Sequence, residues 1–234
     1  MNLSDFPIVE GNFISRPNRF IARVMIVDGD VEREITAHVP NTGRMSELLV
    51  SGARVKMAYN PAPYRKTDYT LLTVKFNEIW VCVHSTIANA LAFEYMKAQP
   101  GVNALKREVT YGNSRFDLAF EKEGYSCLYE VKSANLVIGS TAMFPDAPTE
   151  RGSKHLEELM KAYESGHMAG VLFVIQREDA EFFMPNKKTD PKFSNLLKKS
   201  FDLGLDIHAL RCLIDGNTIV IDSEIPIKFE ENIG

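Results

Sequence analysis

Hydrophobic and polar residues alternate along the first eighty residues in short runs that turn-forming residues separate. Residues 19–27 and 31–39 are two such runs, and Asp28-Gly29-Asp30 between them suits the positive φ angles of a tight hairpin turn. Similar runs follow at 53–59, 69–76 and 79–83, with Pro and Gly between them. Helical periodicity is absent here. Evenly spaced short strands of this kind predict a small, OB-like β-barrel over residues 1–84.

The pattern changes after His84. Apolar residues recur at i, i+4, i+8 and i+11 from Ile87, which predicts a helix over 85–98 that Pro100-Gly101 ends. Further strands are expected at 108–111, 115–121, 127–133, 170–176, 207–214 and 218–221, and further helices at 153–165 and 191–203. The order is α, β, β, β, α, β, then α, β. Residues 85–234 are therefore predicted to form a second, α/β domain.

Two neighbouring strands carry the candidate chemistry. Period-two alternation in 115–121 puts Asp117 on the face opposite three large apolar residues, which are expected to be buried, and alternation in 127–133 likewise places Glu130 away from the core. If Glu123-Gly124 is a two-residue hairpin loop, the residue numbers of paired positions sum to 247. Asp117 then lies opposite Glu130, with Cβ atoms roughly 4.5 to 5.5 Å apart.

Two carboxylates that face each other repel, and a divalent cation between them removes that cost. Asp and Glu oxygens are hard ligands that suit Mg²⁺ or Mn²⁺, and Lys132 on the same face as Glu130 can stabilise charge on a phosphate. This set predicts a phosphodiester-cleaving site. The alternative is an exposed polar hairpin face, where Glu-x-Lys is a common coincidence. Glu94 and Glu108 are candidate further ligands, and for each the alternative is a solvated glutamate.

Several cations are candidates for contact with DNA. Arg19 and Arg23 share one face of a strand, and Tyr64-Arg65-Lys66 puts an aromatic ring beside two cations, a mixture that single-stranded or distorted nucleic acid uses. Near the helix at 153–165, phosphates can be held by Arg151, Lys154 and His155. The alternative is a set of scattered, solvated side chains.

Composition narrows the class of protein. The net charge of −4 and the pI near 5.8 give no long-range attraction for nucleic acid, so DNA binding requires local clustering of the 27 Lys and Arg residues. Three widely spaced cysteines without a C-x-x-C motif support neither a disulfide framework nor a cysteine zinc site. Neither a secretory leader nor an apolar stretch of about 18 residues is found, so we expect a cytoplasmic protein without a membrane partner. Motifs of nucleotide-binding loops, zinc proteases and serine hydrolases are also absent. The oligomeric state stays open.

Five longer segments carry a resemblance to a known family. They are Arg16-Pro-Asn-Arg-Phe, His38-Val-Pro-Asn-Thr-Gly-Arg-Met, Tyr111-Gly-Asn-Ser-Arg-Phe-Asp, Tyr129-Glu-Val-Lys-Ser and Phe144-Pro-Asp-Ala-Pro-Thr-Glu-Arg-Gly-Ser-Lys-His-Leu. Together, and in this order, they resemble the sugar fermentation stimulation protein A family across nearly the whole chain. The resemblance implies an OB-like barrel joined to a restriction-endonuclease-like domain, and a DNA-binding protein linked to the regulation of sugar use. Arg16 and Arg44 of these segments join the candidate DNA contacts.

The second half also resembles the PD-(D/E)xK nuclease superfamily. On that motif Asp117 matches the first acid, Glu130 the second and Lys132 the lysine, while Phe116 replaces the proline. Two functions compete. One is a magnesium-dependent nuclease in which a metal-activated water attacks the phosphodiester; the other is a non-catalytic DNA-binding regulator of sugar metabolism genes. A third hypothesis, an enzyme that acts on sugars themselves, is not supported, because the sequence shows no carboxylate pair on a suitable scaffold.

Overall fold

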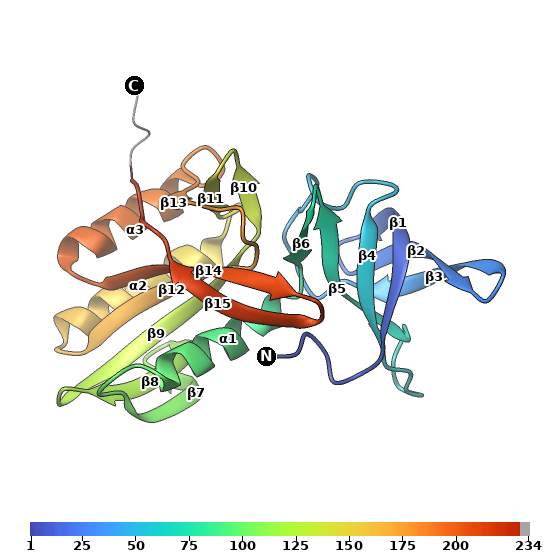
Figure 1. The fold of residues 1–234 in the computed structure, drawn as a ribbon. Helices are drawn as coiled ribbons and strands as arrows, with labels where there is room; N and C mark the ends of the chain where they lie inside the picture. Colours follow the sequence, from blue (N-terminus) through green and yellow to red (C-terminus); the bar gives the residue numbers. More distant parts are fainter. Residues whose placement is uncertain (230–234) are drawn as a thin grey trace.

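Six strands at the start of the chain close into a barrel. They are β1 (Ile8–Asn18), β2 (Ile21–Asp28), β3 (Val31–His38), β4 (Arg54–Tyr59), β5 (Tyr69–Phe76) and β6 (Ile79–Cys82). The sheet order is β3-β2-β1-β4-β5-β6, and a parallel pairing of β3 with β5 closes the barrel around side chains such as Val24, Val55 and Leu71. The structure is a computed structural model that describes residues 1–229 of the chain (Figure 1).

The sequence pattern does not predict β1, although this strand lies in the middle of the sheet between β2 and β4. Gly11 and Pro17 interrupt its run of apolar residues, and both residues count against a central strand. A Cβ atom on Gly11 would lie 2.6 Å from the carbonyl oxygen of Met25. Glycine is therefore required where β1 and β2 approach closely. Gly11 thus makes β1 hard to recognise in the sequence and also allows it to pair with β2.

The rest of the chain forms an α/β domain with helices on both faces of a six-stranded sheet (Figure 1). Its helices are α1 (Ser85–Lys97), α2 (Glu150–Glu164) and α3 (Pro191–Leu203). The sheet has the order β15-β14-β12-β9-β8-β7 and a smaller sheet has the order β10-β11-β13. The strands are β7 (Asn103–Tyr111), β8 (Ser114–Lys122), β9 (Tyr125–Ala134), β10 (Leu136–Ile138), β11 (Thr141–Phe144), β12 (Met168–Ile175), β13 (Phe182–Pro185), β14 (Asp206–Asp215) and β15 (Thr218–Glu224).

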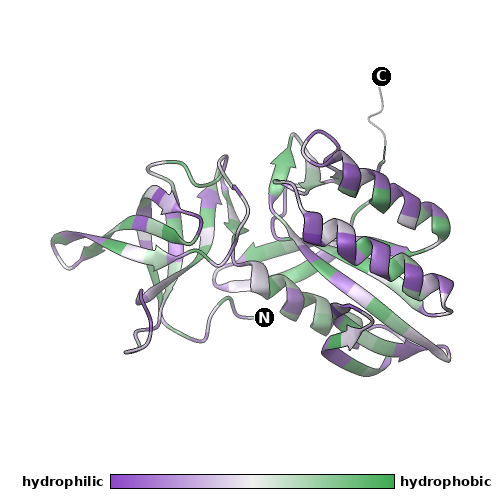
Figure 2. Cartoon of the chain, turned by 180° about the vertical axis from the view of Figure 1, so that it is seen from behind, coloured by the Kyte–Doolittle hydropathy of each residue, from purple (hydrophilic) through white to green (hydrophobic). Residues whose placement is uncertain are grey.

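The two faces of the large sheet have separate cores. Val171 and Phe173 of β12 pack in the core that contains residues of α2 and α3, whereas Leu172 and Val174 pack in the core that contains residues of α1. In Figure 2, α2 and α3 accordingly show polar and apolar stripes along their length. No helix among residues 1–229 is long and apolar enough to cross a membrane.

The β8–β9 hairpin has the predicted register. Glu123 and Gly124 form its turn with φ angles of 53° and 85°, and the ladder runs from Lys122↔Tyr125 to Leu118↔Tyr129. Asp117 is the first residue beyond this ladder, so the predicted pair of Asp117 with Glu130 is not a ladder pair, although the register leads toward it. The expected single buried face is wrong, because Phe116 packs in the core on the α2 side while Leu118 packs in the core on the α1 side. The alternation therefore changes phase at Asp117, where β8 stops pairing with β9.

Buried amide groups join the two domains behind this hairpin. The Asn135 Nδ2 donates to the carbonyl oxygen of Cys82, and the Gln176 Nε2 donates to the carbonyl oxygen of His84 at 3.2 Å. Ser133 at the end of β9 donates in turn to Gln176. Because these groups are buried and hydrogen-bonded, they fix the end of β9 against the last strand of the barrel.

Candidate active site

Asp117 is held from two sides. The side-chain amide of Asn89 on α1 donates to its Oδ1 at 2.8 Å, and the backbone N–H of Val131 on β9 donates to its Oδ2 at 2.8 Å. Burial and, after it, the charge of Glu130 raise the pKa of Asp117 to about 6, against the opposing effects of the Val131 hydrogen bond and of Lys132. The carboxyl group is thus fixed in place and carries a charge that the site penalises.

Glu130 is almost completely buried, with 4% of the residue exposed. Its Oε1 accepts a hydrogen bond from the Lys132 Nζ at 2.6 Å and contacts the Nδ1 of His155. Burial alone would raise the pKa of Glu130, but the bonds from His155 and Lys132 outweigh burial and lower the pKa. The Oε2 of this ionised group is buried and has no hydrogen-bond partner among residues 1–229.

His155 on α2 supports Glu130 and does not reach the surface, since only 6% of the residue is exposed. The Arg151 Nε donates to the His155 Nε2 at 3.4 Å. A ring nitrogen that accepts carries no proton, so the Nδ1 carries the hydrogen that His155 donates to Glu130. The predicted contact of His155 with DNA is therefore corrected: packing of α2 over β9 buries the ring against a carboxylate 25 positions away in the sequence.

The two further candidate ligands lie apart from this pair or at its edge. Glu94 follows Asn89 by five positions on α1, which turns it by about 140° around the helix, and it lines a different cavity with Ile219 and Ile221 of β15. Its expected place beside Asp117 is therefore corrected. Glu108 forms an exposed ion pair with Arg115 at 2.8 Å and makes a small contribution to the raised pKa of Asp117. Among residues 1–229, no three His, Cys, Asp or Glu side chains form a metal-binding cluster.

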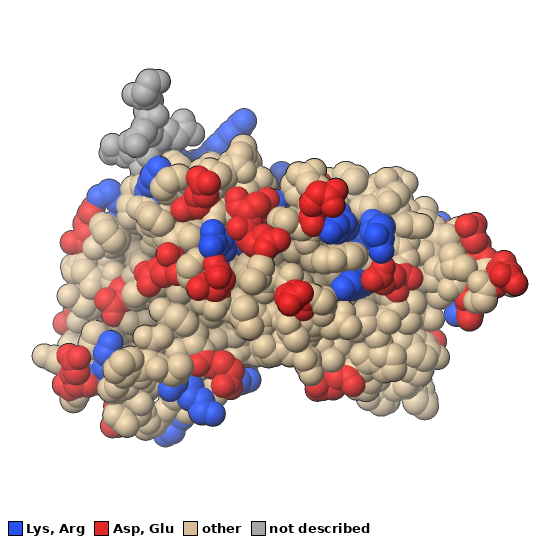
Figure 3. Space-filling model, in the orientation of Figure 1, with Lys and Arg blue, Asp and Glu red and all other residues tan. Residues whose placement is uncertain are grey.

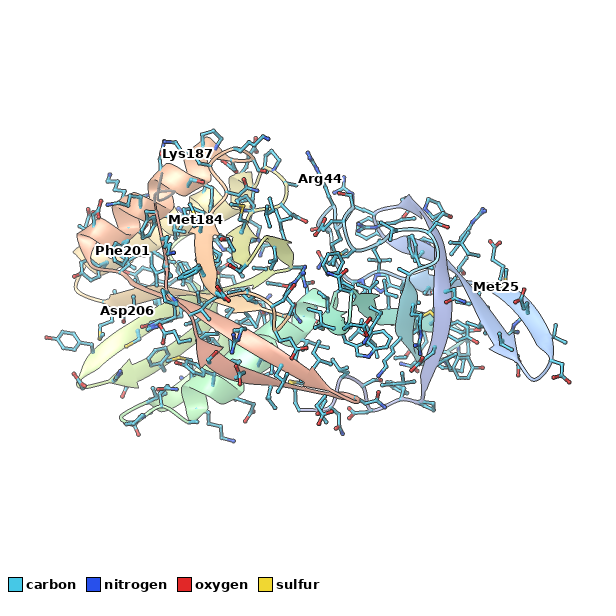
Figure 4. The ribbon with its side chains drawn as sticks, turned by 45° about the horizontal axis from the view of Figure 1, so that its top comes forward. Met25, Arg44, Met184, Lys187, Phe201 and Asp206 are labelled. Atoms are coloured by element: carbon cyan, nitrogen blue, oxygen red, sulfur yellow. The ribbon has the colours of Figure 1, made fainter. Side chains whose placement is uncertain are left out.

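A cavity of about 870 Å³ lies beside this site, between the two domains. Lys132 and the loop 143–149 line it from the second domain, and Arg19 and the loop 41–44 line it from the barrel. The backbone N–H of Arg44 donates to the Asp146 Oδ2 at 2.8 Å, which joins the two loops. Figure 4 labels Arg44 between the two domains. The barrel thus presents cations to the end of β9 that carries the candidate catalytic residues.

The structure places the ten predicted DNA contacts in different settings. Arg16 donates to four backbone carbonyl oxygens, including those of Gly43 at 2.7 Å and Asn41 at 2.8 Å, so it orders the barrel loops instead of offering a free cation. Arg19 and Arg44 line the cavity between the domains, and Arg65 and Lys66 line a second cavity.

The other candidates lie elsewhere. Arg23 forms an ion pair with Glu34 at 3.5 Å on the β2–β3 hairpin, and Tyr64 is 88% exposed. Arg151 and Lys154 are exposed in the first turns of α2, next to the buried His155. Asn89 was missed as a site residue, although a polar residue beside the apolar stripe of the predicted helix was a signal that this face meets a polar group.

Comparisons with known proteins agree with this architecture. Residues 14–83 match a family model described as the SfsA N-terminal OB domain, and residues 82–218 match one described as the sugar fermentation stimulation protein RE domain. The chain is 40% identical over 227 residues to a sugar fermentation stimulation protein homolog of Desulforamulus reducens, with 94% of this chain and 92% of the relative covered. A homolog of the same description from Acetivibrio thermocellus is 42% identical over 228 residues, with 94% and 96% covered.

A solved structure is also similar over almost all of the chain. It is described as Pyrococcus furiosus SfsA in complex with Ca²⁺, and it has a TM-score of 0.85 and 31% identity, with 98% of this chain and all of that chain covered. The OB barrel and the following α/β domain expected from the sequence are thereby confirmed. The fold, the two matched domains and the identity to relatives together show that the chain belongs to the sugar fermentation stimulation protein A family.

Proposed function

We propose that the protein is a divalent-metal-dependent DNA nuclease of the PD-(D/E)xK type, in which Asp117 and Glu130 hold Mg²⁺ or Mn²⁺ and Lys132 assists. One observation carries the proposal: the Oε2 of Glu130 is buried, charged and without a partner. Leaving such an oxygen unpaired is costly, on the order of 1 to 3 kcal/mol or more. A cation at this oxygen would remove the cost.

The chemistry of the donors supports the same ion. Carboxylate oxygens are hard ligands that prefer Mg²⁺, Mn²⁺ and Ca²⁺. The related protein of Pyrococcus furiosus is described in complex with Ca²⁺, and we extend divalent-cation binding to this chain on that likeness. Glu108 remains the candidate for an additional ligand because its charge acts on Asp117.

The residues around the two acids have separate tasks in this proposal. Asn89 and the Val131 N–H orient Asp117, and His155 orients Glu130. The Lys132 ammonium lines the cavity and offsets negative charge that builds up on the phosphate oxygens. A bound divalent ion supplies Lewis-acid stabilisation of the same charge. DNA is the partner, and the division near residue 84 separates a DNA-binding barrel from the cleaving domain.

A second candidate is a DNA-binding protein that does not cleave DNA. The observation that favours it is that Glu130 already has a cation as its partner: the Lys132 Nζ donates to Glu130 at 2.6 Å. In addition, no third acidic, His or Cys side chain of residues 1–229 completes a metal-binding cluster. In this alternative the ion pair replaces the metal, and the domain keeps its fold for binding.

Nicking of a supercoiled plasmid separates the two candidates. We expect nicking with Mg²⁺ or Mn²⁺ and none with a chelator, and we expect its loss in both Asp117→Asn and Lys132→Ala. The exposed residues Asp202 and Lys187 supply the matched controls Asp202→Asn and Lys187→Ala, which should cut like the wild type. Lys132→Ala should still bind the metal, whereas Asp117→Asn should not. Full nicking by Asp117→Asn would reject the nuclease and leave the DNA-binding alternative.

A further inference from the structure

A second cavity adjoins the one between the domains. It has a volume of about 530 Å³ and is lined by Phe20, His38 and Lys66 of the barrel. Thr86 in the first turn of α1 lines both cavities. Arg19, which lines the first cavity, directly precedes Phe20, which lines the second. The two cavities are therefore neighbours on one surface, which we call the trough.

The trough is cationic although the whole chain has a net charge of −4. The first cavity is lined by Arg19, Arg44 and Lys132, and by Arg16, which already donates to backbone carbonyl oxygens, against a single carboxylate, that of Asp146, which accepts a hydrogen bond from the backbone of Arg44. The second cavity is lined by Arg65 and Lys66, and no Asp or Glu of residues 1–229 lines it. Such a local concentration of positive charge attracts phosphate. It is the clustering of Lys and Arg that a chain of negative net charge requires in order to bind DNA.

Phe20 offers an aromatic surface beside these cations. It is 50% exposed in the turn between β1 and β2, and the guanidinium carbon of Arg19 lies 5.9 Å from its ring centroid. Aromatic rings beside cations bind single-stranded nucleic acid because unpaired bases stack on them. The bases of a duplex already stack on one another, so this arrangement favours a single strand.

The two histidines of the second cavity add uncharged polar groups. Burial lowers the pKa of His38 and of His84, and the charge of Arg65 lowers that of His38 further. The Nδ1 of His84 lies 2.9 Å from the Oγ1 of Thr86. Neutral rings near pH 7 donate and accept hydrogen bonds without repelling the cations, which suits the edges of unpaired bases.

We propose that the trough binds single-stranded DNA, with a base stacked on Phe20 and phosphates on Lys66 and Arg19, and that it leads the strand to Lys132. This inference rests on the proposed function, since it names the form of substrate for the same site. Binding in the trough requires no metal, so it can be measured separately from cleavage.

Fluorescence anisotropy of a labelled 12-nucleotide oligo(dT), titrated with the full chain in chelator and low salt, tests the trough. Phe20→Ala should weaken binding about ten-fold, within the range known for loss of one base–aromatic stack. Phe20→Trp should retain the affinity, and its fluorescence should fall as the oligonucleotide binds. The control is Phe6→Ala, because Phe6 is similarly exposed at 47% and lines neither cavity. Lys66→Ala should also weaken the binding of oligo(dT), and Lys187→Ala is its matched control.

Wild-type affinity of Phe20→Ala for oligo(dT), or an equal loss for a duplex of the same length, would overturn the proposal. Its failure is distinguishable from failure of the nuclease. If Phe20→Ala loses single-strand binding while the wild type does not nick DNA, the trough proposal is supported and the nuclease proposal is rejected. If the wild type nicks DNA while Phe20→Ala binds oligo(dT) normally, the nuclease proposal is supported and the trough proposal is rejected.

Discussion

The barrel and the second domain bury different kinds of side chain. The barrel core is made mostly of apolar residues and buries one charged side chain, Lys56, among residues 1–84, whereas the second domain buries Glu130, His155, Gln176 and Arg177. A closed barrel satisfies its backbone through its own ladders. The second sheet ends its pairing of β8 with β9 at Asp117, and the buried charges gather beside that end. The difference teaches that the second domain holds the candidate chemistry, while the barrel contributes surface cations.

Figure 3 shows how the charged side chains are distributed over one face of the molecule. Lys, Arg, Asp and Glu are interspersed over both domains, and acidic residues gather at the tip of the β2–β3 hairpin, at the right of the view. The tip of the β2–β3 hairpin therefore carries mainly negative charge on this face. The cations that face the second domain are the ones that line the cavity between the domains.

The largest expected effect is on the buried pair of the second domain. His155→Ala removes a hydrogen bond to a buried carboxylate, so we expect a loss of about 3 kcal/mol in the free energy of unfolding. His208→Ala is the matched control, because His208 forms the same type of pair with Glu224 on the surface. It should cost less than about 1 kcal/mol. Urea denaturation measures both, and equal losses would remove the contrast between the buried and the exposed pair.

Asp117→Asn should stabilise the protein in chelator. The raised pKa, from 3.8 to about 6, means that burial penalises the charged carboxylate. Discounted for partial exposure, the gain is about 1 to 2 kcal/mol, and it is reduced by up to about 1 kcal/mol because the amide can accept only one of the hydrogen bonds from Asn89 and Val131. The gain is full above pH 6, where the folded wild type is charged, and it fades toward pH 4, where the wild type is protonated. Thermal melts at pH 8 and pH 4 measure it, and a destabilised variant at pH 8 would mean that Asp117 serves the fold.

The smallest effect on folding belongs to the barrel. Replacing Arg19 and Arg44 by Ala should leave the unfolding free energy unchanged within about 0.5 kcal/mol. The same variant should weaken DNA binding and reduce the salt dependence by about 0.9 for each phosphate that it no longer neutralises. Arg23→Ala on the β2–β3 hairpin is the control, and it should change neither property. A titration of DNA binding against salt concentration checks both, and an unchanged slope in the double variant would place the DNA elsewhere.

Much of the fold could be predicted from the sequence because it rests on local patterns. The helix at Pro191–Leu203 matches the expected bounds because Pro191 and Gly204 mark its ends. The strand at Tyr69–Phe76 also matches the expected bounds. The short strands β10, β11 and β13 were missed, because three or four residues are too few to show a period. β1 was missed because a close approach of two strands, which requires Gly11, leaves no trace in hydrophobicity.

The candidate site likewise has residues that the sequence could predict and residues that it could not. The register that brings β8 and β9 together followed from Glu123-Gly124, whose two positive φ angles fix a two-residue turn. The contact of His155 with Glu130 and that of Asn89 with Asp117 depend on how helices pack across the sheet. No periodicity within one segment contains that information. Residues on the hairpin itself were therefore accessible to prediction, whereas the helical residues that support them were not.

The most direct test of the account is calorimetric titration of the protein with Mn²⁺. The wild type should bind the ion saturably below millimolar concentration, because a cation would pair with the Asp117 carboxylate and with the unpaired Oε2 of Glu130. Asp117→Asn, which keeps the shape of the side chain, should show no saturable binding, and Asp202→Asn should behave like the wild type. Absence of binding by the wild type at millimolar Mn²⁺, or an unchanged titration of Asp117→Asn, would contradict the central claim that these two carboxylates form a metal site.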